Sequence, residues 1–465
     1  MSSKKSNFKC NSLKLSKYML HALQNSGFNN LVYYNNRNAE GNALPSPFLP
    51  QVDLSVIEIS EDNKIIGACN ILYDRNHPQG YEVKLDRETI TANNQISFNI
   101  WREDRWTNPA LWNTPPAPLD VITNPPNAKF SFMLPYPASC LKTMVAFIFM
   151  TLVDEGKLTL NTVITYQENG CEPPPSGISK SNILSVWLNQ MITISENFAT
   201  SVLLQYLYLT NELKNSQDKF NNIGLNALKF GPALSPACGK GWEDGFFAMG
   251  SIDTSKLLSI IFGVCGKLWT TFDGKKIYAD KILSKKSQKF LQDLLYNYAF
   301  AEVLNPVGLC GSPYKIQGFK TTIPPQFIGP NNHLVVPLPE DDFVLDFGYD
   351  MSPCLKMANT KFGHKTGLTQ FAGGDHGYVT SIKPCNKKYI ITLHTSAGSK
   401  FADPELASAK PDACTQYTIC YSNAFPRIAN YINKLLFNNC DNKCHNCDNK
   451  CHNSNYFSKI FKFDK

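Results

Sequence analysis

The chain has 465 residues, of which 43% are hydrophobic, 12% are aromatic and only 18% are charged. This composition is typical of a folded globular protein and excludes an intrinsically disordered chain. The net charge of +7 is too small to indicate a nucleic acid as partner. No run of about 18 or more apolar residues occurs, so we predict no membrane span.

The cysteine content bears on the cellular compartment. Fifteen cysteines are an odd number, spread along a long chain, so we expect free thiols rather than a disulfide framework. The basic, serine-rich start has neither the apolar stretch nor the cleavage site of a secretory signal. Together these features favour a soluble, cytoplasmic protein over a secreted one.

The first third of the chain mixes polar and strand-like segments. Residues 1–50 are expected to form a polar N-terminal leader that contains a short helix at 14–23. Residues 52–59 and 65–73 are apolar runs around a polar turn, which predicts a β-hairpin, although the alternation of the first run changes phase at Ile57. The following residues, up to 128, carry no clear period, and their prolines argue against a helix.

The rest of the chain alternates predicted helices and strands. The clearest buried helix is 142–155, because apolar side chains cover most of its circumference and Gly156 is suited to end it. Further helices are expected at 197–208, 254–263, 284–304 and 425–437, and strands at 366–367, 377–382 and 389–395. Residues 305–358 are rich in Pro and Gly and are predicted to be an insertion or a lid.

The only internal repeat lies at the end of the chain. The sequence Cys-Asp-Asn-Lys-Cys-His-Asn occurs at 440–446 and again at 447–453. Its cysteines, with two histidines, could hold one zinc ion; they are Cys440, Cys444, Cys447 and Cys451. Their spacing differs from the usual C-x2-C pairs, so a duplicated short unit that folds into nothing stays the alternative.

Three short motifs carry chemistry. They are Ser139-Cys140-Leu141-Lys142, Ser195-Glu196-Asn197 and Lys365-Thr366-Gly367. Ser139 stands at the start of the most apolar helix, beside unpaired backbone N–H groups. Lys142 lies one turn further on the same face, where burial is expected to lower its pKa, and a neutral amine can activate a serine hydroxyl. For this motif alone, the alternative is an N-capping serine followed by a lysine that reaches solvent.

In their order and flanks, these motifs resemble those of the penicillin-recognising serine enzymes, namely class A β-lactamases, D,D-peptidases and penicillin-binding proteins. The resemblance covers roughly residues 51–436. It implies an α+β fold of the β-lactamase/transpeptidase-like type, in which an antiparallel sheet is flanked by helices and joined by an all-helical subdomain. We therefore predict one such domain at 51–436, with the insertion at 305–358, between the leader 1–50 and a Cys/His-rich tail at 437–465.

The resemblance also implies a role for each motif residue. The catalytic residues would be the nucleophile Ser139, its general base Lys142, and Ser195 as relay of a proton to the leaving nitrogen. The substrate would be bound by Asn197, Lys365, Thr366 and Gly367. The backbone N–H groups of Ser139 and Leu368 would form the oxyanion hole. This chemistry needs no cofactor and no metal in the catalytic site.

The sequence departs from class A β-lactamases at two places. Their deacylating glutamate has no clear counterpart, because the only acids between 230 and 249 are Glu243 and Asp244, and a solvated loop position is the favoured interpretation of Glu243. Glu196 stands where class A enzymes have Asp. The first difference favours a long-lived acyl-enzyme, as in a D,D-peptidase or a penicillin-binding protein.

The leading hypothesis is a serine acyl-hydrolase, either a β-lactamase or a D,D-carboxypeptidase-type enzyme, that acts on a small β-lactam or on an acyl-peptide or ester. The alternative is a non-catalytic binding or structural module that keeps the fold. Cys140 is expected to be a small buried filler. His364 and His376, which flank the third motif, are expected to be structural or to support the site indirectly.

Overall fold

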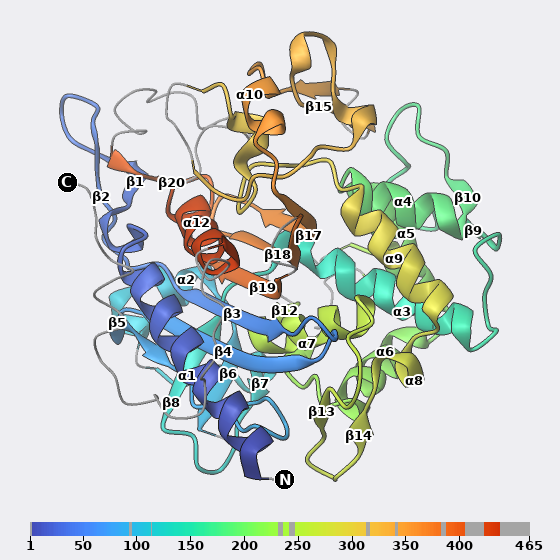
Figure 1. The fold of residues 1–465 in the computed structure, drawn as a ribbon. Helices are drawn as coiled ribbons and strands as arrows, with labels where there is room; N and C mark the ends of the chain where they lie inside the picture. Colours follow the sequence, from blue (N-terminus) through green and yellow to red (C-terminus); the bar gives the residue numbers. More distant parts are fainter. Residues whose placement is uncertain are drawn as a thin grey trace.

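The computed structural model describes residues 2–92, 95–112, 114–230, 236–240, 247–312, 317–339, 343–382, 387–404 and 423–437 (Figure 1). Its centre is a six-stranded sheet in which all neighbouring strands are antiparallel, in the order β17-β18-β19-β3-β4-β5. The strands are β3 (Val52–Ile59), β4 (Ile65–Asp74), β5 (His77–Glu82), β17 (Thr360–Leu368), β18 (Gly373–Ser381) and β19 (Lys388–Thr395). The predicted hairpin is β3–β4, and the three predicted C-terminal strands are β17 to β19.

Two helices from opposite ends of the chain cover one face of this sheet. They are α1 (Ser2–Gln24) and α12 (Ala424–Phe437), which lie against each other in Figure 1. Buried α1 side chains such as Met19 and Leu23 join the same apolar cluster as Ile428 of α12 and Leu54 of β3. The segment predicted as a polar leader therefore adds to the core, whereas the domain boundaries at 50 and 436 stay predictions.

Helices α7 (Ser251–Ile261) and α9 (Lys285–Tyr296) pack against the other face of the sheet. The helical part beside them comprises α3 (Lys142–Asp154), α4 (Leu184–Thr193), α5 (Asn197–Leu209), α6 (Glu212–Asn222) and α8 (Ala279–Ile282), coloured from teal to yellow in Figure 1. α7 packs on β3 and β19, where Ser255 Oγ hydrogen-bonds Ser55 Oγ at 2.8 Å and Thr392 Oγ1 at 2.9 Å. The predicted α+β class, with a sheet flanked by helices and a helical part, is confirmed.

Smaller sheets complete the fold. A three-stranded sheet combines β1 (Val32–Arg37), β2 (Ala43–Pro45) and β20 (Phe401–Ala402), and another combines β6 (Ile96–Ile100), β7 (Val121–Thr123) and β8 (Phe130–Leu134). Two-stranded pairs are β9 (Val163–Thr165) with β10 (Ser181–Ile183), β11 (Leu228–Lys229) with β12 (Ala248–Met249), and β13 (Trp269–Thr270) with β14 (Lys276–Ile277). The strands β6 and β7 of this sheet, with the short helix α2 (Glu103–Thr107), lie in the segment up to residue 128 where no regular structure is predicted.

The segment predicted as an insertion has an apolar cluster of its own. It contains the hairpin β15 (Val335–Leu338) and β16 (Phe343–Asp346) and the short helix α10 (Ser352–Lys356). Leu334, Val336 and Phe347 are among its buried residues. Cys310 and Cys354 form a disulfide across it. The Pro- and Gly-rich composition hid these elements because each is only four or five residues long.

Two disulfides correct the expectation of free thiols. Cys171 pairs with Cys238, and Cys310 pairs with Cys354, although 67 and 44 positions separate the partners along the chain. Among the described residues four other cysteines form no disulfide: Cys10, Cys69, Cys140 and Cys265. Chain spacing did not reveal the pairs because the tertiary fold alone brings their Cα atoms to 5.5 and 6.0 Å.

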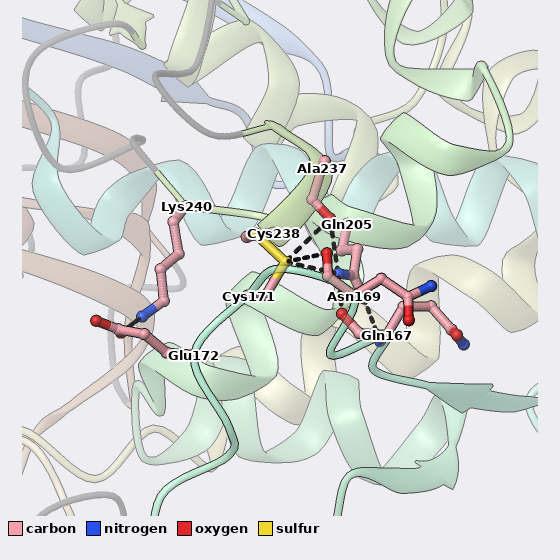
Figure 2. Close-up of a disulfide and its surroundings, with 8 residues drawn as sticks. All are labelled: Gln167, Asn169, Cys171, Glu172, Gln205, Ala237, Cys238 and Lys240. Carbon is pink, nitrogen blue, oxygen red and sulfur yellow. Dashed lines mark hydrogen bonds and ion pairs between the residues drawn. A yellow bond between two sulfur atoms is a disulfide. The ribbon is translucent and has the colours of Figure 1, made fainter.

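Figure 2 shows the first disulfide, which joins the loop between β9 and β10 to the 3-10 turn Pro236–Cys238. Gln205 of α5 donates from Nε2 to the carbonyl of Ala237 at 2.7 Å and to that of Gln167 at 2.9 Å, and so binds both partners of the link. None of the described helices is long and apolar enough to cross a membrane.

Candidate active site

The proposed nucleophile lies in a short 3-10 turn. This turn, η4 (Ala138–Leu141), comes directly before α3. Ser139 does not cap α3, whose N-cap residue is Leu141. Ala138 is held in the left-handed region at φ 47°, a conformation that costs energy in a residue with a side chain. Ser139 is half-buried, and its hydroxyl makes no hydrogen bond with another described residue.

Lys142, the first residue of α3, faces the second motif. The side chain is fully buried. Its Nζ donates to Ser195 Oγ at 3.1 Å, to Asn197 Oδ1 at 2.7 Å and to the carbonyl oxygen of Ser195. The first and second motifs therefore meet through Lys142. The expected hydrogen bond from Lys142 to Ser139 is not among these contacts.

The start of α5 leaves the hydroxyl of Ser195 out of helix capping. The N-cap is Glu196, whose carboxylate accepts from the N–H groups of Phe198 at 3.1 Å and Ala199 at 2.5 Å. Glutamate is an uncommon N-cap residue. Ser195 itself is strained at φ 59°. Because Glu196 caps the helix, the Ser195 hydroxyl is left to the two lysines.

The third motif lies on β17, the edge strand of the central sheet. Lys365 Nζ donates to Ser195 Oγ at 2.8 Å, to the carbonyl of Thr366 at 2.9 Å and to Tyr298 OH at 3.1 Å. Burial, and next the nearby charge of Lys142, hold the pKa of Lys365 well below the ordinary lysine value. All three motifs are therefore joined through the single hydroxyl of Ser195.

Tyr298 is a site residue that the sequence did not reveal. Its hydroxyl hydrogen-bonds Thr366 Oγ1 and Lys365 Nζ, and its ring lies under the Lys365 ammonium, 4.3 Å from Nζ to the centroid. We had placed it inside a helix at 284–304, but α9 ends at Tyr296. The following segment runs along β17, where Leu304 N donates to Asp375 at 3.1 Å. No spacing signal in the sequence pointed to this arrangement.

The K-T-G side chains, which the resemblance assigns to substrate binding, are buried in the structure. Lys365 is 0% and Thr366 is 3% exposed, and the Thr366 hydroxyl is already engaged by Tyr298. Gly367 packs against the backbone of η4 without room for a side chain. Thr369 N donates to Ala372 O at 2.8 Å, on the β18 side. Since successive N–H groups of a strand point in opposite directions, the N–H of Leu368 is expected to point away from β18, and its role as an oxyanion-hole donor stays a prediction.

Buried acids lie behind the third motif. Asp375 of β18 accepts from His364 Nδ1 at 2.9 Å, so a buried hydrogen bond holds the His364 ring. Glu302 is also buried, and burial raises its pKa to about 8. Both carboxyl groups lie close enough to Lys365 to affect its charge. No pattern in the sequence pointed to Glu302, which lies, like Tyr298, in the segment that follows α9.

Of the other residues that the sequence analysis singled out, some are buried in the structure and the rest lie outside the described residues. Cys140 is fully buried and its thiol donates to Lys365 O at 3.5 Å; burial raises its pKa, so it is inert as a nucleophile. His376 bonds Thr143 Oγ1 of α3 at 2.9 Å. The acids Glu243 and Asp244 and the tail cysteines Cys440, Cys444, Cys447 and Cys451 lie outside the described residues.

These features define a class of protein. A serine turn before a buried helix, a second serine at the start of α5 and K-T-G on the edge of an antiparallel sheet make up the β-lactamase/transpeptidase-like fold. The model of the β-lactamase enzyme family matches residues 134–237, which hold the first two motifs. This match supports, over that segment, the resemblance to serine β-lactamases and penicillin-binding proteins that the motifs carry.

Solved structures similar to this chain carry related names. The structure of PBP-A has 14% identity and a TM-score of 0.44, with 84% of this chain and 91% of that chain covered. A representative of class A β-lactamase from Bacteroides cellulosilyticus DSM 14838 has 13% identity and a TM-score of 0.41, with 83% and 94% covered. A β-lactamase from Chitinophaga pinensis DSM 2588 has 17% identity and a TM-score of 0.38, with 64% and 84% covered. No curated protein matches the chain significantly.

Proposed function

We propose that this protein is a serine acyl-hydrolase whose Ser139 attacks the carbonyl of a β-lactam or of an acyl-peptide or ester. The observation that carries the proposal is the position of Ser195 Oγ, which lies 3.1 Å from Lys142 Nζ and 2.8 Å from Lys365 Nζ. Two ammonium groups at one hydroxyl repel each other, and this repulsion favours a neutral amine at one of them. A neutral amine next to the serine turn is the base that acylation requires.

The acylation step moves one proton and exchanges one bond. Lys142 takes the proton of Ser139 as Oγ bonds to the carbonyl carbon, and the oxyanion forms at the N–H groups of Ser139 and Leu368. The C–N or C–O bond then breaks, and Ser195 passes the proton to the leaving atom. Lys365 and Thr366 bind the carboxylate of the substrate, and Tyr298 positions both residues through its hydroxyl. Asn197 binds the amide of the substrate's side chain. Water later hydrolyses the ester on Ser139.

Deacylation separates the two enzyme types within this class. No carboxylate base for the attacking water is found beside Ser139 among the described residues, and Glu243 and Asp244 lie outside them. We therefore expect slow deacylation, as in a D,D-peptidase or a penicillin-binding protein rather than a β-lactamase. One observation supports the non-catalytic module instead: the K-T-G side chains are buried and Tyr298 already occupies the Thr366 hydroxyl.

The proposal also concerns the cellular compartment in which the protein acts. Two disulfides favour an oxidising environment over the reducing cytoplasm that we expected from the sequence. Such an environment is also where cell-wall peptides, the substrates of D,D-peptidases, are found. We infer that the protein acts in an oxidising compartment.

The test is covalent labelling with a fluorescent penicillin, followed by intact mass over time. We expect one stable adduct that peptide mapping assigns to Ser139, and none in Ser139→Ala. Ser185→Ala, a half-buried serine of α4, is the matched control and should label like the natural protein. An adduct that persists in Ser139→Ala would overturn the assignment of the nucleophile. A natural protein that is folded and never labelled would favour the module.

A further inference from the structure

Three buried side chains, of residue types that commonly bind metals in proteins, meet behind the nucleophile turn. One ligand atom each of Cys140, His376 and His394 lies within 4.8 Å of the other two. All three residues are 0% exposed, and they come from η4, β18 and β19. The proposed acyl transfer uses none of them. Two buried histidines and a thiol without a catalytic task need another explanation.

Each histidine has one ring nitrogen without a partner. His394 Nδ1 is 2.8 Å from the carbonyl oxygen of Met249, which can only accept, so Nδ1 carries the proton and Nε2 carries a lone pair. That Nε2 is buried and has no hydrogen-bond partner among the described residues. His376 has the mirrored arrangement: Nε2 bonds Thr143 Oγ1 at 2.9 Å, and Nδ1 is buried without a described partner. Burial lowers the pKa of both rings.

Two glycines leave room for the ligands above the sheet. Gly367 and Gly374 are paired across β17 and β18. A Cβ on Gly367 would lie 3.0 Å from Cys140 Sγ, and a Cβ on Gly374 would lie 3.1 Å from Cδ2 of His394, the atom bonded to Nε2. The thiol and the free edge of the imidazole therefore approach the same pair of glycines.

We propose that Cys140, His376 and His394 bind one thiophilic transition-metal ion, with Zn²⁺ as the probe, behind the nucleophile turn. A thiolate with two imidazoles suits zinc in a tetrahedral site. The second nitrogen of each ring is already bound to Met249 or Thr143, as the outer partners of metal-bound histidines are. Binding releases the thiol proton to solvent, and the S–H bond is replaced by a bond from sulfur to the metal. Because the metal bonds are about 2.0–2.3 Å long, the ligand atoms must close in by about 1 Å.

The bound ion would tie the nucleophile turn to two strands of the sheet. Cys140 follows Ser139 directly, and its thiol proton, now shared with Lys365 O, would be lost on binding. The thiolate offsets one of the two charges of the ion beside the amine of Lys365. The role is structural, so the proposal holds whether or not Ser139 is acylated.

The test measures zinc in the full-length chain by elemental mass spectrometry. The parent carries serine in place of Cys440, Cys444, Cys447 and Cys451, so that the tail contributes no zinc. In this parent we introduce Cys140→Ser and, separately, His394→Gln. Cys69→Ser is the matched control, since Cys69 is also free and fully buried but lies outside the cluster. We expect about one zinc ion per chain in the parent and in Cys69→Ser, and none in the other two variants.

A second measurement covers variants that fold poorly. Zinc should raise the melting temperature of the metal-stripped parent, and Co²⁺ should give it a thiolate charge-transfer band that Cys140→Ser lacks. A folded Cys140→Ser protein with as much zinc as the parent would overturn the proposal. So would a parent that binds no zinc and neither melts higher with zinc nor gives the band with Co²⁺. Penicillin labelling of the same samples reports separately on the proposed function.

Discussion

Gly367 of β17 lies against the carbonyl oxygen of Pro137, so closely that a Cβ on the glycine would be 2.1 Å from that oxygen. The same Cβ would be 2.8 Å from the backbone nitrogen of Cys140. Real Cβ atoms do not approach backbone atoms so closely, and backbone cannot rotate away as a side chain can. The glycine of the third motif thus sets the distance between the edge strand and the turn that carries Ser139.

Gly367→Ala should therefore push η4 away from β17 and separate Ser139 from the N–H of Leu368. We expect penicillin labelling to slow by at least about tenfold, in line with the loss of one aligned oxyanion donor. Gly67→Ala on β4 is the control, since its Cβ would meet its nearest neighbour, Asn11, at 3.1 Å and needs only a small shift. Equal labelling rates for the two folded variants would contradict this reading of the contact.

Ser195→Ala removes the hydroxyl that both lysines share. Loss of a proton relay should slow acylation by about 10²–10⁴-fold and leave the site of labelling unchanged. The second-order rate constant of labelling measures this, with Ser185→Ala as reference. If Ser195→Ala were acylated at the natural rate, the proton would reach the leaving group by another route.

The lowered pKa of Lys365 should appear in the pH profile of labelling. An amine with a lowered pKa loses its charge as pH rises, before an ordinary lysine would at 10.5. Labelling by an anionic penicillin should then fall at alkaline pH earlier than that value, because the substrate carboxylate loses its cation. The methyl ester of the same penicillin lacks the carboxylate and should not share this decline. A constant ratio of the two rates across the alkaline range would exclude Lys365 as the carboxylate-binding group.

Glu302 should make the protein less stable at higher pH. Burial raises the pKa of its carboxyl from 4.5 to about 8 in the folded protein. Its stabilising contribution is therefore complete below pH 4.5 and is lost as the pH rises through 8, by up to about 5 kcal/mol for a shift of that size. Denaturant unfolding of Glu302→Gln between these limits should show a flatter profile than the natural protein. The exposed Glu168→Gln should keep the natural slope.

The disulfide between Cys171 and Cys238 should stabilise the folded protein, because it closes a loop of 67 positions in the unfolded chain. Replacing both cysteines by serine should lower the free energy of unfolding by about 2–4 kcal/mol. Cys265→Ser, which removes an exposed free thiol, should change it little. Non-reducing peptide mapping of the natural protein checks the premise, since two free thiols at these positions would contradict the structure.

Much of the fold followed from apolar patterns. The apolar run of α3 predicted a buried helix, and its end near Gly156, at φ 72°, was predicted from the residue type. The change of phase in β3 also has a physical cause. Val56 joins the cluster under α1 and α12, whereas Ile57 joins the cluster under the opposite helices. A strand buried on both faces has no polar side to keep the alternation regular.

The candidate site was predictable only in part. The order and spacing of the three motifs identified Lys142, Ser195 and Lys365 as candidates, and the structure places all three within one hydrogen-bonded group. Their finer roles depend on tertiary contacts. Tyr298 reaches Thr366 only because α9 ends early, and Glu196 caps α5 against the ordinary preference for serine. Single-sequence patterns carry no information on such contacts between distant segments.

The pairing of β3 with β19 has a consequence for the order of folding. Ile59 is paired with Lys388, so the two central strands come from opposite ends of the chain. A ribosome releases the nucleophile turn long before it releases β17, β18 and β19, so a growing chain carries Ser139 and Lys142 without Lys365. Pairing between such distant segments is slow and leaves β3 and β4 with an open edge meanwhile. The helix α1, already synthesised, can cover one face of these two strands until the rest of the sheet arrives.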